Sequence, residues 1–216
     1  DKIHRSLSIR MGDLLDRQYL ADRLGTICDI RTRELDALGV KAPPLDPQSL
    51  TQRFQDMGDQ LRPHITDKVY ALHAEVNTGH RLLYEGANAC LLDIDHGTFP
   101  YVTSSNTTLS GVVSGTGVNM SLIKYGLGIT KAYSTRVGHG PFPSELSNEI
   151  GNKIGKIGGE IGATTGRTRR CGWLDLKVLK NSIRLNNLTG IALTKIDVLD
   201  HFKEISICVD YGLIDY

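Results

Sequence analysis

From about residue 81 onward, short runs of apolar and β-branched residues alternate with glycine-rich connections and helical patterns. The runs are RLLYEGA, GITKAYSTRVG, TGIALTKID and EISICVDY. Leu176, Leu179 and Ile183 form a helical stripe just before the run around Ile191. Strands that alternate with helices predict an α/β fold in which a mostly parallel central sheet is flanked by helices. In such folds, ligands bind at the carboxyl ends of the strands.

The first part of the chain follows a different, helical pattern from residue 13 to about residue 80. Apolar residues recur there at the spacing of one helix face: Leu50, Phe54, Met57 and Leu61. The proline-rich stretch KAPPLDP and Pro63 interrupt this pattern. We therefore expect a mainly helical subregion over residues 1–80, as a cap, a lid or plain scaffold, and an α/β core over residues 81–216 within the same domain.

Charge and cysteine usage exclude several classes of protein. The chain has 25 Lys and Arg against 24 Asp and Glu, a net charge of +1, so no overall positive field exists to hold a nucleic acid. Its four cysteines show no C-x-x-C pairing, which argues against a zinc site or a disulfide framework. No apolar stretch has the length of a membrane span. We expect a cytoplasmic protein, and a piece of a longer one, because the chain opens on Asp1 without Met.

The stretch LTKID matches the [NT]-K-x-D pattern with which GTP-binding proteins read guanine. Thr194, Lys195 and Asp197 follow an apolar run, where a strand is expected to end. A carboxylate at this spacing accepts both guanine N–H groups, while the Lys stem lies along the base. Four letters are also compatible with an ordinary Lys and Asp at a strand end. The phosphate-binding G-x-x-x-x-G-K-[ST] loop is missing, and GNKIGK is interpreted as a turn region with a solvated Lys.

A second stretch, GATTGRTRRCGW, places Arg167, Arg169 and Arg170 within a run of Gly and Thr. Gly permits close backbone approach, Thr donates hydroxyls, and each guanidinium offers a planar fork to a carboxylate or phosphate. A solvated basic turn is the alternative. Clustered like charges are costly unless an anion relieves them, so we favour a small-anion site. Trp173, directly after the loop, is expected in the core.

Two further candidates have simpler interpretations. VTSSNTT is rich in hydroxyls that suit a phosphate at a helix N-terminus, but taken by itself we favour an ordinary Ser or Thr cap. His96 has no second histidine at ligand spacing, so we expect a structural role. No arrangement of nucleophile, base and orienting residue emerges.

Four stretches taken together resemble the motifs of adenylosuccinate synthetases in order and spacing. They are EGANACLLDIDHGTFPYVTSSNTT, KAYSTRVGHGPFPSEL, GATTGRTRRCGWLDL and LTKIDVLD. The resemblance runs from Asp1 to about Tyr211 and covers roughly half of a family member. It implies a fold like that of P-loop NTPases and the GTP-dependent ligation of IMP and L-aspartate to adenylosuccinate, GDP and phosphate in AMP biosynthesis. A non-catalytic purine-nucleotide-binding or dimerisation module of the same fold is the alternative.

The resemblance also implies a role for individual residues. Those implied to contact IMP are Arg5, which would act across a homodimer interface, Asn88, Thr103 and Arg167. The implied aspartate-binding loop comprises Ala163, Thr164, Thr165, Gly166, Arg167, Thr168 and Arg169. The implied GTP contacts are Arg169, Lys195, Ile196 and Asp197.

This sequence departs from the family pattern in two places. Asn88 stands where members also carry Gln, and Thr168 stands where many carry Lys or Arg. The family's phosphate loop, with its Asp base and Mg²⁺ ligand, and its His acid would all precede Asp1. We therefore assign no catalytic residue and no metal ligand to this chain, and we expect Mg²⁺ to be held outside it. The 216 residues alone are expected to be inactive.

Overall fold

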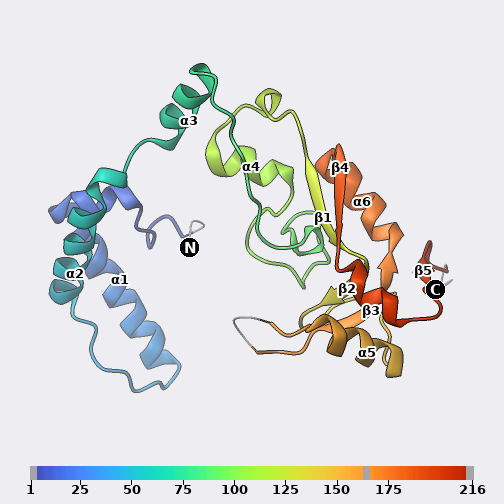
Figure 1. Cartoon of the computed structure of the whole chain (residues 1–216). Coiled ribbons are helices and arrows are strands. Elements are labelled where there is room, and N and C mark those ends of the chain that lie inside the picture. The colour runs from blue at the N-terminus through green and yellow to red at the C-terminus, as the bar shows by residue number, and fades with distance from the viewer. Residues whose placement is uncertain (1–3, 163–165, 213–216) are drawn as a thin grey trace. The chain divides into compact units, whose positions relative to one another are not determined.

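The computed structural model of the chain describes residues 4–162 and 166–212 (Figure 1). It divides into two compact units, Asp1–Ala71 and Leu72–Tyr216, which are described separately below. The sequence-based boundary between residues 80 and 81 stays a prediction. Helix α3 (Lys68–Asn77) spans the division and begins after Asp67, whose carboxylate accepts a hydrogen bond from the Val69 amide at 2.9 Å.

The first unit is helical. Its elements are the 3₁₀ helix η1 (Met11–Leu15), helix α1 (Arg17–Ala37), helix α2 (Pro47–Leu61) and the 3₁₀ helix η2 (Arg62–His64). Asp16 caps α1 by accepting from the Tyr19 amide at 3.0 Å. Asp46 caps α2, and Pro47 occupies its first turn, where a missing N–H costs nothing.

A small apolar core joins η1, α1 and α2. It is built from Leu14, Leu20 and Leu24, with Leu50 and Phe54 packed against it. The predicted apolar stripe of α2 is therefore confirmed at its first two positions. Its last two residues, Met57 and Leu61, remain 39% and 37% exposed.

The second unit alternates helices and strands. After α3 come η3 (Cys90–Leu92), α4 (Leu109–Thr116), η4 (Met120–Leu122), β1 (Leu127–Lys131), β2 (Tyr133–Arg136), α5 (Glu149–Gly158), β3 (Arg170–Asp175), α6 (Leu176–Asn186), β4 (Gly190–Thr194), η5 (Ile196–His201) and β5 (Ile207–Cys208). In Figure 1 the helix α6 leads from β3 back to β4, which lies beside β1. The helix predicted from Leu176, Leu179 and Ile183 is confirmed.

The described strands form two sheets. β1 and β4 pair in parallel, from Leu127 opposite Gly190 to Lys131 opposite Thr194. β3 pairs antiparallel with β2 and parallel with β5. Buried Ala132 separates β1 from β2, and its amide continues the first ladder by donating to the Thr194 carbonyl at 2.9 Å. The prediction of a mostly parallel α/β fold is confirmed, with its strands shared between two sheets.

One predicted strand does not form. Residues 81–87, RLLYEGA, have no regular structure, and Leu83 is 95% exposed. A strand needs a neighbour to accept its backbone hydrogen bonds, and none of the described strands pairs with this segment. The apolar run alone could not show whether a partner strand lies beside it.

The interpretation of GNKIGK as a turn region is wrong, because these residues lie within α5. A Cβ atom at Gly151 would stand 1.9 Å from the Leu146 carbonyl oxygen, and one at Gly158 would stand 2.3 Å from the Tyr133 hydroxyl. These glycines therefore allow the helix to pack closely against its neighbours. Lys156 is exposed, in agreement with the solvated Lys expected there.

The core of the second unit lies between α5, η5 and the β2–β3 sheet. Its buried members are Ala132, Tyr133, Ile154, Cys171, Val198 and Leu199. Trp173 packs against this core and meets Phe202 edge to face, with ring centroids 5.8 Å apart, so its predicted core position is confirmed.

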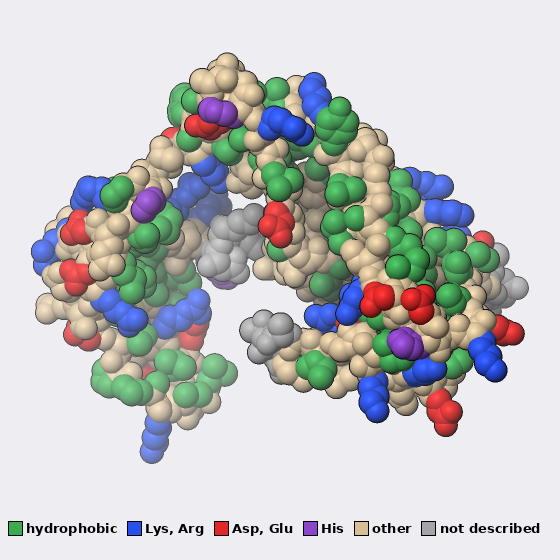
Figure 2. Space-filling model, viewed as in Figure 1, with side chains coloured by type: hydrophobic (Ala, Val, Ile, Leu, Met, Phe, Trp, Pro, Cys, Tyr) green, Lys and Arg blue, Asp and Glu red, His purple; other side chains and the backbone are tan. Residues whose placement is uncertain are grey.

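Charged side chains of both signs are spread over the face seen in Figure 2. Lys and Arg side chains stand among Asp and Glu there, in keeping with the net charge of +1. Within the described ranges, no helix is both long enough and apolar enough to cross a membrane.

Candidate functional site

Backbone hydrogen bonds close the base of the arginine loop. The Gly162 amide donates to the Arg167 carbonyl at 2.8 Å, and Ile161 pairs with Thr168 as an isolated antiparallel bridge. Gly166, at a φ of 63°, donates to the Gly162 carbonyl at 2.8 Å, in a conformation that suits glycine. Gly166, Arg167 and Thr168 are exposed. The predicted aspartate-binding residues Ala163, Thr164 and Thr165 lie outside the described residues.

Glu160, just before this loop, is a buried carboxylate that binds three donors. The residue is 2% exposed. Its Oε2 accepts from Lys131 Nζ at 2.7 Å and from Arg169 Nη1 at 2.9 Å, and its Oε1 accepts from the Tyr133 hydroxyl at 2.5 Å. The Glu160 carbonyl also accepts from the Arg169 amide at 2.9 Å. Both the backbone and the side chain of Arg169 are thus held by this one residue.

The surroundings of Glu160 favour its ionised form. Burial by itself raises the pKa of this carboxyl, but the hydrogen bonds from Lys131, Tyr133 and Arg169 outweigh burial and lower the pKa. Burial and the neighbouring Glu160 carboxylate raise the pKa of Tyr133. The phenol therefore stays a hydrogen-bond donor. Sequence reasoning missed Glu160, although an acid between glycines directly before a basic loop was a usable signal.

Arg170, the third arginine of the loop, has a structural role. Its guanidinium binds both carboxylate oxygens of Glu145, from Nε at 2.7 Å and from Nη2 at 2.5 Å. Its Nη1 donates to the carbonyls of Gly138 and Gly140 at 3.1 and 3.0 Å. The guanidinium also lies over the Phe142 ring, 5.5 Å from its centroid.

The LTKID stretch forms the end of β4 and the start of η5, as its pattern predicted for a strand end. Lys195 adopts a left-handed conformation with a φ of 61° and donates from Nζ to the Gly158 carbonyl at 2.7 Å. Asp197 is exposed in the first turn of η5, and Ile196 is 59% exposed. This geometry leaves a carboxylate open to an incoming donor.

The structure brings Lys195 and Arg169 to one short turn, although they are distant in sequence. Lys195 contacts Gly158 and Arg169 contacts Glu160, on either side of Gly159. Gly159, at a φ of 60°, ends helix α5. The two motifs singled out from the sequence therefore share one structural support.

A separate buried carboxylate organises the segment that carries Asn88 and Thr103. Asp93 is 0% exposed and accepts four backbone N–H groups, from Asp95, His96, Thr107 and Thr108, at 2.6 to 3.2 Å. The Thr103 amide donates to the Leu92 carbonyl at 2.9 Å, and Asn88 has a φ of 66°. Asp93 was not singled out from the sequence, although an Asp side chain that accepts from the backbone N–H groups two and three residues later is a common way to form a turn.

This arrangement corrects the interpretation of VTSSNTT as an ordinary Ser or Thr cap. Thr108 is the N-cap of α4, but its side chain makes no capping bond and pairs with the Ser110 hydroxyl at 2.8 Å. The Thr108 amide is bound by Asp93 instead, and the Leu109 amide by Asn186 Oδ1 at 2.8 Å. Acceptors distant in sequence have replaced the local cap, which the local pattern could not reveal.

Arg5 belongs to the first unit. It is exposed there, beside a cavity of about 570 Å³ that is also lined by Leu7, Ser8, Ile9, Arg10, Asp13 and Tyr19. Its own carbonyl accepts from the Ser8 hydroxyl at 3.3 Å. The structure therefore leaves the Arg5 side chain at a surface.

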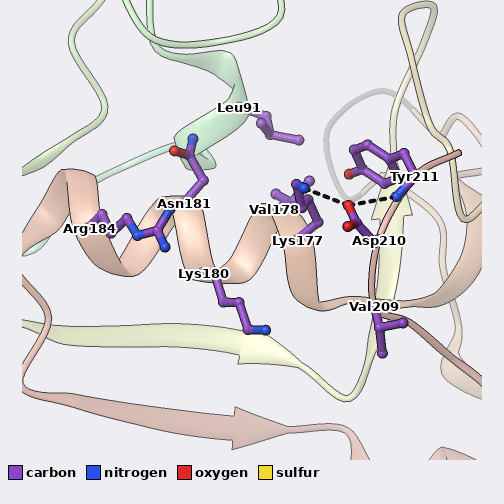
Figure 3. A pocket seen from close by; sticks show the side chains of 9 residues that line it. All are labelled: Leu91, Lys177, Val178, Lys180, Asn181, Arg184, Val209, Asp210 and Tyr211. Atoms are coloured by element: carbon purple, nitrogen blue, oxygen red, sulfur yellow. Dashed lines mark hydrogen bonds and ion pairs between the residues drawn. The ribbon is translucent and has the colours of Figure 1, made fainter. Parts of the chain in front are cut away.

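A cavity of about 480 Å³ in the second unit contains none of the predicted site residues (Figure 3). It lies between α6 and the segment after β5. Asp210 binds Lys177 Nζ at 2.5 Å on one side and the Tyr211 amide at 2.9 Å on the other. The Tyr211 hydroxyl donates to Asp175 at 2.7 Å, so this wall is held by the protein's own contacts.

A family model for adenylosuccinate synthetase matches residues 1–215. The chain belongs to the adenylosuccinate synthetase family. It is 47% identical over 211 residues to the adenylosuccinate synthetase of Alcanivorax borkumensis, covering 98% of this chain and 49% of that protein. It is 46% identical over 211 residues to the one of Chromohalobacter salexigens, covering 98% of this chain and 48% of that protein.

A solved adenylosuccinate synthetase has the same fold. The fully ligated structure from Plasmodium falciparum superimposes with a TM-score of 0.85 at 38% identity, covering 94% of this chain and 47% of that one. The chain thus spans about half the length of the adenylosuccinate synthetases it matches. The family resemblance and the P-loop-NTPase-like α/β fold expected from the sequence are confirmed.

Proposed function

We propose that the protein carrying this chain catalyses the GTP-dependent ligation of IMP and L-aspartate to adenylosuccinate, with release of GDP and phosphate, in AMP biosynthesis. The observation that carries the proposal is the shared support of Lys195 and Arg169 on the turn from Gly158 to Glu160. A guanine-reading motif and a basic loop for a small anion are thereby held beside each other, in a chain of the matching family.

The proposed ligand contacts follow from the chemistry of the exposed groups. Exposed Asp197 accepts the two guanine N–H groups, while Lys195 and Ile196 lie along the base. The carboxylates of aspartate bind to the arginine loop, which comprises Ala163, Thr164, Thr165, Gly166, Arg167, Thr168 and Arg169. Within this loop, Arg167 also reaches IMP and Arg169 reaches GTP. Asn88 and Thr103 contact IMP.

We also propose a cytoplasmic homodimer in which Arg5 of one subunit reaches the IMP phosphate of the other. Its exposed side chain in the first unit is compatible with that role. A guanidinium suits a phosphate because its planar fork donates two parallel hydrogen bonds.

Mg²⁺ is the expected cofactor, and its ligands are proposed to lie outside this chain. Across residues 4–162 and 166–212, no group of three or more His, Cys, Asp or Glu side chains is placed to hold a metal ion. The described residues therefore do not fit a metal site of their own. The work of this chain is to bind and orient IMP, aspartate and the guanine base.

The test is the conversion of IMP by the protein at its natural length, with GTP, aspartate and Mg²⁺ supplied together. We expect adenylosuccinate to form only when all four are present. Binding of IMP or GTP without any turnover would overturn the proposal and favour a non-catalytic nucleotide-binding or dimerisation module. For residues 1–216 alone we propose no turnover, since no general acid, base or metal ligand is assigned within them.

A further inference from the structure

Glu160 stands at the junction of two elements that the proposed function assigns to ligands. It contacts Arg169 through its side chain and its carbonyl, and it lies two residues after the carbonyl that binds Lys195. Glu160 itself is buried, so it cannot meet a substrate directly. Any influence on the site must pass through the residues that it binds.

The charges around Glu160 are not balanced. Lys131 and Arg169 bring two positive charges to one carboxylate oxygen, at 2.7 and 2.9 Å. The Arg169 side chain is 31% exposed, and a guanidinium has five N–H donors, of which Glu160 takes one from Nη1. Glu160 thus orients the partly exposed Arg169 guanidinium through one N–H group, and the guanidinium has four further N–H groups with which to meet an anion.

We infer that Glu160 is a positioning residue for aspartate and GTP, acting through Arg169 and through the turn that also holds Lys195. This inference rests on the proposed function. Glu160 holds the guanidinium of Arg169 in one orientation, and its carbonyl closes the base of the arginine loop. An unpaired Arg169 would sample other rotamers, and a misplacement of about 1 Å at a binding group can cost on the order of 100-fold in rate.

The kinetic test uses Glu160→Gln in the protein at its natural length. Gln keeps the size of the side chain and loses the negative charge. We expect kcat/KM for aspartate to fall on the order of 10- to 100-fold, with a smaller loss for GTP and an IMP KM close to that of wild type. An equal loss for all three substrates would indicate general damage to the fold and would overturn the inference.

Two control variants separate positioning from stability. Tyr133→Phe removes the hydroxyl donor to Glu160 and leaves both cations in place, so the aspartate KM should stay near the wild-type value. Glu145→Gln breaks the ion pair of the neighbouring Arg170 and should lower stability without a selective effect on aspartate. A selective aspartate effect of the same size in Glu145→Gln would contradict a specific role for Glu160.

A double-mutant cycle tests whether Glu160 acts through Arg169. If it does, Glu160→Gln combined with Arg169→Ala should lose no more kcat/KM for aspartate than Arg169→Ala alone. Additive losses would refute the pathway through Arg169. Should Glu160→Gln fail to fold, Glu160→Asp keeps the charge, shortens the reach by one methylene and is expected to show the same selectivity in weaker form.

Hydrogen exchange gives a readout that does not depend on turnover. The amides of Gly162 and Arg169 are hydrogen-bonded within the base of the arginine loop. Loss of the Glu160 charge loosens the hold on Arg169, so these two amides should exchange about tenfold faster in Glu160→Gln than in wild type. Faster exchange in a protein without ligase activity would refute the proposed function and keep Glu160 as the loop anchor. If the wild-type protein is active but Glu160→Gln has unchanged exchange rates and unchanged KM values, the role of Glu160 is refuted and the proposed function is not.

Discussion

Arg170 and Glu145 form a bidentate ion pair that ties strand β3 to the segment before α5. Both side chains are about two-thirds or more buried, with exposed fractions of 31% and 27%. The hydrogen bonds from Arg170 lower the pKa of Glu145, although burial by itself would raise it. The Arg170 guanidinium is shared among Glu145 and two backbone carbonyls, whereas that of Arg169, in the same short stretch, binds Glu160.

Breaking this pair should destabilise the second unit. We expect Glu145→Gln to lower the free energy of unfolding by about 1–3 kcal/mol, because a partly buried guanidinium loses its counter-charge. Denaturant unfolding measures this free energy in the second unit when it is followed by the fluorescence of Trp173, the single Trp of the chain. Lys177→Gln breaks an exposed pair with Asp210 and should leave the midpoint unchanged. Equal midpoints for Glu145→Gln and wild type would contradict the structural role of Arg170.

Asp93 predicts how stability depends on pH. Burial alone would raise the pKa of Asp93, but four backbone N–H groups lower it from its ordinary value of 3.8. A carboxyl with a depressed folded-state pKa contributes stability above its unfolded-state pKa and loses that contribution as the pH falls through the folded-state pKa. The unfolding free energy should therefore drop as the pH is lowered below about 4.

Asp93→Asn isolates that contribution. The variant should be less stable than wild type at pH 7 by about 1–3 kcal/mol, and its stability should change less with acidification. Asp95→Asn, at an exposed position two residues later, is the matched control and should keep the wild-type pH profile. A wild-type profile in Asp93→Asn as well would show that other carboxyls set the acid limit.

Gly151 should not tolerate a side chain. Gly151→Ala would place a methyl group 1.9 Å from the Leu146 carbonyl oxygen, so α5 would have to shift, at a cost of about 1–3 kcal/mol. Gly155→Ala, one turn later in the same helix, meets only Cys171 Sγ at 3.4 Å and should be neutral or slightly stabilising. Thermal unfolding of both variants checks the contrast, and equal midpoints would mean that α5 is not packed as closely as the structure shows.

Asp197 should decide the choice of purine nucleotide. Asp197→Asn replaces a pure acceptor by a group that also donates, so the KM for GTP should rise on the order of 10- to 100-fold. Xanthosine triphosphate carries an acceptor oxygen where guanine has an amino group. In Asp197→Asn it should therefore become a better phosphoryl donor than GTP. Steady-state kinetics with both nucleotides measure this change. Asp200→Asn, an exposed carboxyl in the same 3₁₀ helix, should have no effect.

Arg167 should matter for ligands and not for the fold. Arg167→Leu removes an exposed guanidinium from the loop, so saturation by aspartate and by IMP should weaken on the order of 10-fold or more, with little change in the unfolding midpoint. Arg184→Leu, an exposed arginine on α6, is the control and should keep both saturation curves. Unchanged curves for Arg167→Leu would rule out its proposed role.

Local patterns in the sequence were sufficient for several elements. The spacing of Leu176, Leu179 and Ile183 predicted α6, and the apolar run before Thr194 predicted β4 with its polar residues at the strand end. These predictions succeed because helix and strand periodicity follow from the burial of one face, which neighbouring residues alone express.

Local patterns failed where the deciding partner is distant in the chain. GNKIGK looks like a turn until Leu146 is seen against Gly151, and RLLYEGA looks like a strand although none of the described strands pairs with it. The backbone of a segment takes the hydrogen bonds that its surroundings offer, and a linear pattern does not contain those surroundings.

The sequence by itself determined the α/β class, the near-neutral charge that argues against a polyanion partner, and the four stretches that together resemble one family. Only the tertiary structure decided that Lys195 and Arg169 rest on one turn, that Arg170 is bound to Glu145, and that Glu160 is the buried acid beneath the arginine loop. A sequence motif shows which charged and polar side chains the chain contains. Their pairing depends on burial, because a buried carboxylate is stable only beside the cations and hydroxyls that the fold brings to it.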